Sequence, residues 1–410
     1  MRTVSHRPVR AAVVIGLAAI GVSVAVAAPA SASPRSQLRH QVSASFRGST
    51  ARDVHYNVQI AGGPTLTRHS NLTSRPASNE KLITTETLLA QIGPSFEYRT
   101  TFYVTAPVSD GVEDGDLIVV GGGDPTLTSS ELGLLGKDLH QAGLHKVTGN
   151  LVIDDSRYNH WTTAPGWKHG FLPDESGPID AFSVDSDAHG HSSSYLADPT
   201  LANAKILRKE LHSAHIAISG SDKAGRLPAD ATLLRVHRSG ALSQIVRETL
   251  TVSDNYNAEM MLREAGYQAS GEGTRTSGIA AIRAEAKHLH VKLGRIEDGS
   301  GLSYLDAESP RDITRWLHAI HGSNQFHEIY TSVPTSCRTG TLEFRLCGAH
   351  VASRVHAKTG TLDHDVALSG WTHTRSGRLV TFSFLLSKVH STATAETHLD
   401  AAVSRIARYR

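Results

Sequence analysis

The segment Arg75-Pro76-Ala77-Ser78-Asn79-Glu80-Lys81-Leu82 places a serine and a lysine at the start of an apolar run. Their three-residue spacing puts both side chains on one face of a helix, one turn apart. Serine is a weak nucleophile without a base beside it, and a lysine serves as that base only when its pKa is lowered. Ser78 and Lys81 are therefore a candidate nucleophile and base. About one such spacing is expected by chance, so an ordinary N-capping serine is the better explanation until other motifs are found.

The length and charge of the chain limit its class. It has 410 residues, with 41 basic and 39 acidic side chains, a length that favours two domains over one core. The balanced charge, without a polybasic segment, argues against nucleic-acid binding.

The N-terminus predicts export. Three arginines precede an apolar run over residues 11–28, and Ala30-Ser31-Ala32 follows. This order is typical of a secretory signal peptide, so we assign residues 1–32 to a signal and predict a secreted or extracytoplasmic protein, in the periplasm or cell wall. An uncleaved membrane anchor is the alternative, although the run is barely long enough to span a bilayer. Peripheral association with the membrane or wall is also left open.

Cys337 and Cys347 are the only two cysteines. In an exported chain, such a pair is expected to form one disulfide that closes a short loop. The 24 histidines are scattered, without a His-Glu-x-x-His motif or a carboxylate-rich cluster. We therefore predict no metal site and no cofactor.

The hydrophobic pattern predicts a mixed α/β (α+β) architecture. Residues 33–50 are rich in Ser, Arg and Gln and are expected to be poorly ordered. Alternation over 54–60 predicts a strand, and the apolar period over 78–91 predicts a helix that Gly93-Pro94 ends. Further strands are expected over residues 102–105, 116–120, 147–154, 354–357, 366–371 and 378–386, and further helices over 131–142, 242–251, 257–264, 277–288, 310–320 and 396–406.

The pattern of expected helices and strands changes near residue 100 and again near residue 239. We therefore expect a discontinuous catalytic domain formed by residues 33–100 and 239–410, with an inserted domain over residues 101–238. The cluster Gly121-Gly122-Gly123 lacks the spacing of a phosphate-binding loop and predicts a structural turn. A turn-rich segment over 156–198, with Trp161 and Trp167, has a length typical of loops that line a site.

Two further motifs change the interpretation of Ser78 and Lys81. Ser253-Asp254-Asn255 and Lys358-Thr359-Gly360 each occur once, in this order after the first motif. The three motifs together are the signature of penicillin-binding proteins and serine β-lactamases. Each alone is explained by chance, whereas all three in the required order, behind a secretion signal, are not.

A second segment, Arg338-Thr339-Gly340-Thr341-Leu342, nearly duplicates Lys358-Thr359-Gly360-Thr361-Leu362. The catalytic copy should lie on a strand at the edge of the cleft, where its backbone pairs with an extended substrate. Residues 353–357 supply that strand for the second copy, whereas the first copy lies between the two cysteines. We therefore predict that the second copy is the functional one.

Several segments together resemble one family, the class C low-molecular-mass penicillin-binding proteins, or D-alanyl-D-alanine carboxypeptidases/endopeptidases. The resemblance spans nearly all of the mature chain and rests on the three motifs, on residues 115–127 with their glycine cluster, on Asp298-Gly299-Ser300-Gly301-Leu302-Ser303, and on Gly340-Thr341-Leu342 with Arg345. It implies a transpeptidase fold like that of penicillin-binding proteins and serine β-lactamases, with a domain inserted between the first and second motifs. The gap between those motifs looks shorter than is typical, which puts a nested second insertion in doubt.

The resemblance also implies a role for each motif residue. Ser78 would attack the carbonyl between two D-alanines while Lys81 takes its proton. Ser253, assisted by Lys358, would relay a proton to the leaving amine, and Asn255 would hold the substrate amide.

The third motif would bind the terminal carboxylate through Lys358 and Thr359, which precede Gly360. The backbone N–H groups of Ser78 and Thr361 would form the oxyanion hole, worth about 3 kcal/mol per donor. One departure is Tyr304, where many relatives carry an arginine that could hold an acidic group of the substrate. This departure puts side-chain specificity in doubt, but not the reaction.

The sequence thus predicts a serine acyl-transfer enzyme that acts on peptidoglycan stem peptides, with β-lactam antibiotics as covalent inhibitors. A serine β-lactamase or esterase is the first alternative, against which the long insertion argues. A non-catalytic wall-binding protein is the second, against which the three intact motifs argue.

Overall fold

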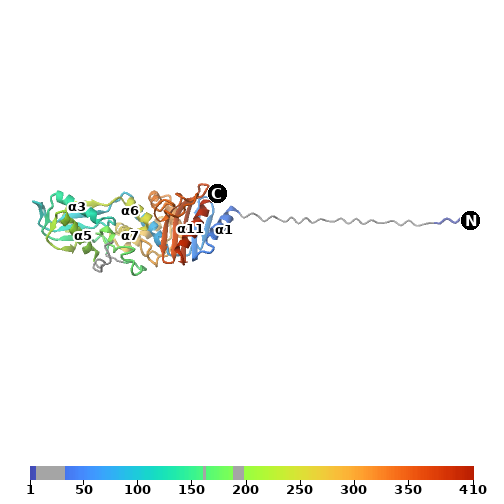
Figure 1. Ribbon diagram of the computed structural model, residues 1–410, viewed down its shortest axis with the longest axis horizontal. Helices are drawn as coiled ribbons and strands as arrows, with labels where there is room; N and C mark the ends of the chain where they lie inside the picture. Colours follow the sequence, from blue (N-terminus) through green and yellow to red (C-terminus); the bar gives the residue numbers. More distant parts are fainter. Residues whose placement is uncertain (6–32, 160–162, 188–197) are drawn as a thin grey trace.

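The computed structural model describes residues 1–5, 33–159, 163–187 and 198–410 (Figure 1). The apolar run and cleavage site of the predicted signal peptide lie outside these ranges, as does Trp161, so the signal stays a prediction. Within the described ranges, no helix combines the length and the apolar character that crossing a bilayer requires.

A five-stranded antiparallel sheet joins the two ends of the chain. The strand order is β12-β13-β14-β1-β2, and in β1 Tyr56 lies opposite Phe384 of β14. Residues before the expected insertion therefore pair with residues near the C-terminus. The strands are β1 (Ala51–Ile60), β2 (Thr65–Arg68), β12 (His356–Leu362), β13 (Asp365–His373) and β14 (Leu379–Val389).

Both faces of this sheet are covered. In β13, Val366 and Leu368 face one apolar core, whereas Ala367 and Trp371 face another, as the alternation of a strand requires. Helix α11 (Thr392–Ala407) covers the first face. The second face packs against a helical layer made of α2 (Lys81–Ile92), α6 (Leu242–Glu248), α7 (Asn255–Ser270), α8 (Arg275–His288), α9 (Pro310–Ile320) and α10 (Phe326–Ser332).

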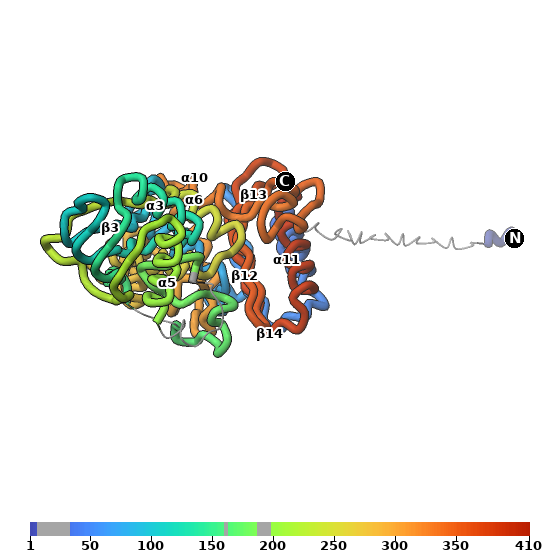
Figure 2. Tube along the Cα trace, turned by 60° about the vertical axis from the view of Figure 1, so that its left-hand side comes forward, coloured from blue at the N-terminus to red at the C-terminus, as the bar shows by residue number. Residues whose placement is uncertain are grey.

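The expectation of a poorly ordered segment over residues 33–50 is wrong. Residues Pro34–Ser45 form helix α1, whose first turn is capped by Ser33 and begins with a proline. Leu38 and Val42, one helical turn apart, are buried in the same core as α11. Two well-placed apolar residues outweigh the polar composition that suggested disorder. Figure 2 shows the start of this segment beside α11.

Residues between α2 and α6 build sheets of their own at one end of the molecule (Figure 1). The larger sheet has the order β10-β8-β6-β3-β11, and α3 (Ser129–Gln141) and α5 (Pro199–Ser213) pack with it around a separate core. The separate core supports the predicted inserted domain. Its strands are β3 (Arg99–Val104), β6 (Leu117–Val120), β8 (Leu151–Asp154), β10 (Asp222–Ala224) and β11 (Thr232–Arg238).

The single strand expected over residues 147–154 is instead divided. β7 (Lys146–Val147) belongs to a small four-stranded sheet with β4 (Val108–Ser109), β5 (Val112–Glu113) and β9 (Ala217–Ile218), whereas β8 belongs to the larger sheet. Gly149 lies between them, where an added Cβ would meet Asp116 and the Gly115 backbone closer than 3 Å. This close approach lets the chain cross from one sheet to the other.

Candidate active site

The segment that carries Ser78 is a tight turn that precedes α2. Residues Ala77–Glu80 form the 3₁₀ turn η1, and Ala77, fully buried, has a φ of 48°. A non-glycine residue in this region costs about 1–3 kcal/mol and is retained where the surroundings fix it. An added Cβ on Gly301 would lie 2.0 Å from the Ala77 carbonyl oxygen, and one on Gly360 would lie 2.9 Å from that of Pro76. Two glycines therefore let neighbouring segments close around this turn.

Lys81 is completely buried beneath Ser78. Its Nζ donates hydrogen bonds to Ser78 Oγ at 2.9 Å, Asn255 Oδ1 at 2.7 Å and the Ser300 carbonyl at 2.7 Å. Burial lowers the pKa of Lys81 to about 8, although carboxylates led by Asp298 oppose the shift. A lysine with this pKa is partly neutral near neutral pH, as a general base for serine must be.

The second motif follows an irregular helical turn. Residues Thr249–Ser253 form a π-turn (η3) between α6 and α7, and Ser253 has a φ of 69°. Asp254 caps α7 by accepting from Asn257 N at 2.7 Å, which fixes Asn255 as the first helical residue. π-turns are frequent at functional sites. Here the turn places Ser253 and Asn255 against the same cleft.

The third motif lies within β12, the edge strand of the first sheet. The strand expected over residues 354–357 is therefore corrected: it begins at His356 and runs through the motif to Leu362. Lys358 is completely buried, and its Nζ donates to the Thr359 carbonyl at 3.1 Å. Burial, and then the charge of Lys81, hold the pKa of Lys358 well below its ordinary value.

These three segments meet at one cavity of about 270 Å³. Ser78, Ser253, Asn255, Thr359, Gly360 and Thr361 line it, while Lys81 and Lys358 lie buried behind the lining. The structure thus brings all eight predicted catalytic and substrate-binding residues to one place. Cys337 and Cys347 form the expected disulfide nearby.

Five further lining residues were not among the predicted site residues, and two of them form hydrogen bonds with predicted ones. Thr341, from the first of the two similar segments, has its hydroxyl 2.6 Å from that of Thr359. Glu175, from the turn-rich segment, accepts from Asn255 Nδ2 through its carbonyl at 2.9 Å and its carboxylate at 3.3 Å. The turn-rich segment was expected to line a site, but nothing in its composition singled out Glu175.

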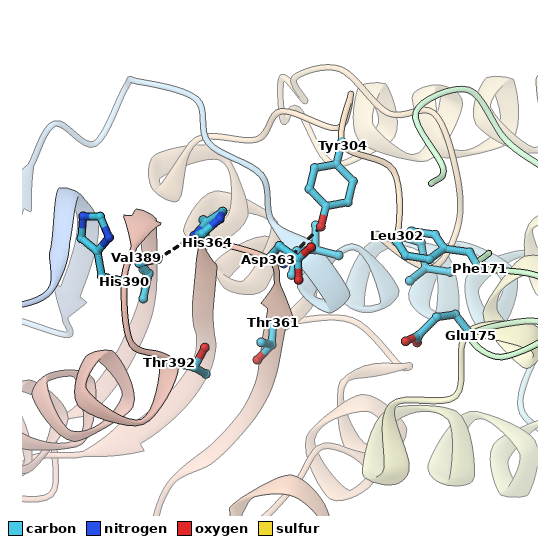
Figure 3. Close-up of a pocket in the computed structure, with 11 residues that line it drawn as sticks. Phe171, Glu175, Leu302, Tyr304, Thr361, Asp363, His364, Val389, His390 and Thr392 are labelled. Atoms are coloured by element: carbon cyan, nitrogen blue, oxygen red, sulfur yellow. Dashed lines mark hydrogen bonds between the residues drawn. The ribbon is translucent and has the colours of Figure 1, made fainter. Parts of the chain in front are cut away.

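A larger neighbouring cavity of about 470 Å³ contains Tyr304 (Figure 3). It shares Glu175, Leu302, Thr361 and Leu362 with the cavity at Ser78. The Tyr304 hydroxyl accepts from Asp363 N at 3.1 Å, and Lys168 Nζ lies 4.2 Å from the centre of its ring. Because Lys168 forms an ion pair with Asp363, its charge is already engaged. Tyr304 is the position at which we expected weaker binding of an acidic group. The cation of Lys168 beside it is therefore already neutralised by Asp363.

Across the part of the chain that the structure describes, no cluster of three or more histidine, cysteine, aspartate or glutamate side chains has a geometry that could hold a metal ion.

Comparison with known proteins gives a family match over most of the chain. The model of the D-Ala-D-Ala carboxypeptidase 3 (S13) family matches residues 54–189 and 183–409. A D-alanyl-D-alanine carboxypeptidase of Actinomadura sp. (strain R39) is 24% identical, and the match covers 82% of this chain and 77% of that protein.

The fold is also found among solved structures. Penicillin binding protein 4 from Haemophilus influenzae superimposes with a TM-score of 0.82 at 19% identity, over 90% of this chain and 99% of that one. A second structure of that protein, complexed with a β-lactam, gives a TM-score of 0.74 at 20% identity over the same shares of the two chains. These likenesses establish the fold.

Proposed function

The chain belongs to the D-Ala-D-Ala carboxypeptidase 3 (S13) family, and we propose that it cleaves the D-alanyl-D-alanine bond of peptidoglycan stem peptides through an acyl-enzyme on Ser78. D-Alanyl cross-links, which present the same bond, are the second proposed substrate. The observation that carries this proposal is the contact between Lys81 Nζ and Ser78 Oγ, in which the lysine has a pKa of about 8.

Acylation begins with proton transfer from Ser78 to neutral Lys81. The Ser78 oxygen then forms a bond to the carbonyl carbon, and the proposed oxyanion hole, the N–H groups of Ser78 and Thr361, binds the developing negative charge. As the carbon–nitrogen bond breaks, the proton reaches the leaving amine through Ser253, assisted by Lys358. Water then releases the peptide and restores the Ser78 hydroxyl.

The two buried lysines assist each other. Lys358 has no carboxylate partner in the described part of the chain, and its pKa is lowered partly by the charge of Lys81. A terminal carboxylate of the substrate would supply that missing partner and favour the charged form of Lys358. A charged Lys358 in turn favours the neutral, basic form of Lys81. Substrate binding would thereby activate the base.

The substrate backbone has a docking edge. Within the sheet β12 pairs only with β13. On its other edge Ala357 N donates to Pro334 O at the start of the strand, and we propose that an extended peptide pairs with this edge from Lys358 onward. Asn255 Nδ2 donates to the carbonyl and the carboxylate of Glu175. We propose that the amide carbonyl of the substrate replaces Glu175 as the acceptor of this hydrogen bond.

The test is incubation of the purified protein with monomeric and cross-linked muropeptides, read out by mass spectrometry. Loss of the terminal alanine from the monomer establishes carboxypeptidase activity, and conversion of the dimer to monomers establishes endopeptidase activity. Ser78→Ala is the control. The proposal fails if neither substrate changes, or if the variant converts them equally.

A serine β-lactamase is the nearest alternative, because it would use the same three motifs. Prompt release of hydrolysed penicillin would identify one, whereas a persistent adduct supports the peptidase. The inserted segment favours the peptidase. A wall-binding protein without activity is excluded if penicillin labels the native protein and spares Ser78→Ala. The extracytoplasmic location follows as a proposal, because the substrate lies outside the cytoplasm.

A further inference from the structure

A cavity of about 330 Å³ lies where the chain leaves α2 to enter the inserted residues and where it returns from them to α6. Glu97 and Arg99 belong to the segment that leaves α2, and Arg238 belongs to the segment that returns to α6. α2 has twelve residues and so spans about 18 Å. Because Ser78 precedes this helix and the cavity lies beyond its other end, the cavity is separate from the cleft at Ser78. Its lining is Ser95, Phe96, Glu97, Arg99, Gly122, Arg157 and Arg238.

Two like charges face each other in this cavity. Arg99 of β3 and Arg238 of β11 are direct partners across an antiparallel pair, so their side chains leave the same face of the sheet. Like charges in this position are destabilising. Glu97 compensates Arg238 at 3.3 Å, whereas Arg99 has no ion pair within the described ranges. One guanidinium at the cavity therefore lacks a counter-charge.

The third arginine is fixed in place. Arg157 forms two hydrogen bonds with the buried Glu264, at 2.7 and 2.9 Å, and its guanidinium stacks on the Tyr267 ring at 3.8 Å. These contacts already hold the Arg157 side chain at the cavity wall. It would therefore lose little further conformational entropy when a ligand binds.

A backbone donor adds to the cations. Gly122 is buried, and the amides on either side are bonded: Gly121 N donates to Asp154 O, and Gly123 N donates to Ala181 O. The Gly122 N–H has no acceptor among the described residues. Buried N–H groups without an acceptor are rare in folded proteins. An added Cβ on Gly122 would lie 1.9 Å from the Arg99 carbonyl, so only glycine brings this donor so close to β3.

From these observations we propose that the cavity binds a small ligand that carries an oxyanion, either a phosphate or a carboxylate. The guanidinium of Arg99 supplies the charge, Arg238 and Arg157 supply further donors, and the Gly122 N–H supplies a neutral one. Proteins bind phosphates and carboxylates with arginine guanidinium groups and with backbone N–H groups that lack another acceptor. The volume is at the lower end of ligand pockets and suits a ligand of modest size.

The test is calorimetric titration at low ionic strength with glycerol phosphate, which carries a phosphate, and N-acetylmuramic acid, which carries a carboxylate. Glycerol and N-acetylglucosamine are the neutral controls. We expect at least one anionic probe to bind, more weakly as salt is added, and neither neutral probe to bind. The anion that binds identifies the oxyanion. The proposal is overturned if neither anion binds, or if the neutral probes bind as well.

Two variants assign the site. Arg99→Gln should weaken binding by about tenfold or more, since one charge-assisted hydrogen bond is lost. Arg235→Gln, a matched change on the neighbouring strand β11 at an arginine paired with Asp138, should leave binding unchanged. Equal losses in both variants would contradict the site.

Thermal unfolding separates binding from a structural role. Arg99→Gln removes the like-charge pair, so its Tm should equal or exceed that of the native protein. A clear fall in Tm would assign Arg99 to stability and overturn the proposal.

Discussion

Two nearly identical segments of this chain, Arg338-Thr339-Gly340-Thr341-Leu342 and Lys358-Thr359-Gly360-Thr361-Leu362, take different structures. The first forms a 3₁₀ turn (η4, Gly340–Leu342) inside the disulfide loop, and the second forms the edge strand β12. Their first residues differ most: Arg338 is exposed, and Lys358 is completely buried. A lysine can be buried and lose its charge, whereas an arginine in proteins stays charged.

The glycines of the two segments serve different needs. Gly340 has a φ of 56°, which glycine adopts without strain, and an added Cβ there would lie 2.2 Å from the Thr251 carbonyl oxygen. Gly360 lies within a strand and is needed because the turn before Ser78 approaches it closely. The segments meet through the hydroxyls of Thr341 and Thr359. Two segments that share four of their five residues therefore line one cleft from two sides, and the surrounding chain decides the structure that each adopts.

The largest expected effect comes from removing the cation of each segment. Lys358→Ala should lower kcat/KM on a D-alanyl-D-alanine peptide by about 10²–10³-fold, because the substrate carboxylate loses its buried partner. Arg338→Ala, at an exposed position, should stay within about twofold of the native value. Steady-state kinetics measure both. Equal losses would show that the segments do not differ as the structure indicates.

Opening the disulfide tests whether the first segment depends on its loop. The double variant Cys337→Ser/Cys347→Ser should lower the free energy of unfolding by about 2–3 kcal/mol, because a constraint on the unfolded chain is lost. Urea unfolding measures this change. Acylation should also slow, because Thr341 is held less firmly. Native acylation with reduced stability would show that the loop has no part in the site.

Substitution of Gly360 tests the close approach of β12 to the nucleophile. The Cβ of Gly360→Ala would lie 2.8 Å from Asn79 Nδ2 and 2.9 Å from the Pro76 carbonyl. Overpacking of this kind costs about 1–3 kcal/mol, so the acylation rate should fall by about ten- to a hundredfold. Gly340→Ala, at a positive φ, should chiefly lower the Tm. A Gly360→Ala variant that acylates at the native rate would remove this distinction.

The hydroxyl pair that joins the segments should have a smaller effect. Thr341→Val removes one hydrogen bond and should reduce kcat/KM by about two- to tenfold. Thr341→Ser keeps the hydroxyl and should restore most of the activity. If Thr341→Val keeps the native activity while Thr341→Ser loses it, the methyl group and not the hydrogen bond is what matters.

The pH profile gives the smallest effect and concerns the buried lysine beside the second segment. Acylation needs neutral Lys81, so its rate should rise with pH through about 8, the pKa of this residue. Glu175 favours the charged form of Lys81, so Glu175→Gln should move this rise to lower pH. Arg338→Gln should leave the profile unchanged. A shift to higher pH in Glu175→Gln would contradict the assigned electrostatics.

Much of this site was predictable from the sequence, because its chemistry resides in short motifs. The order of the three motifs, the choice of Lys358 over Arg338, the disulfide and the insertion before Ser253 all follow from local patterns.

Other features depend on contacts between distant segments. Glu175 and Thr341 reach the cleft only through the folded chain; Glu175 lies in no recognisable motif, and the segment of Thr341 gave no sign that it lines the cleft. Helix α1 was missed because its polar composition concealed the apolar pair Leu38 and Val42. The facing arginines Arg99 and Arg238 become neighbours only through strand pairing across the whole inserted segment.

The central claim is that Ser78 is the nucleophile of this cleft. The most direct measurement is the intact mass of the protein after incubation with penicillin, followed by peptide mapping. We predict one persistent adduct, on the peptide that contains Ser78, and no adduct on Ser78→Ala. An adduct on a different residue, or equal labelling of the variant, would contradict the assignment.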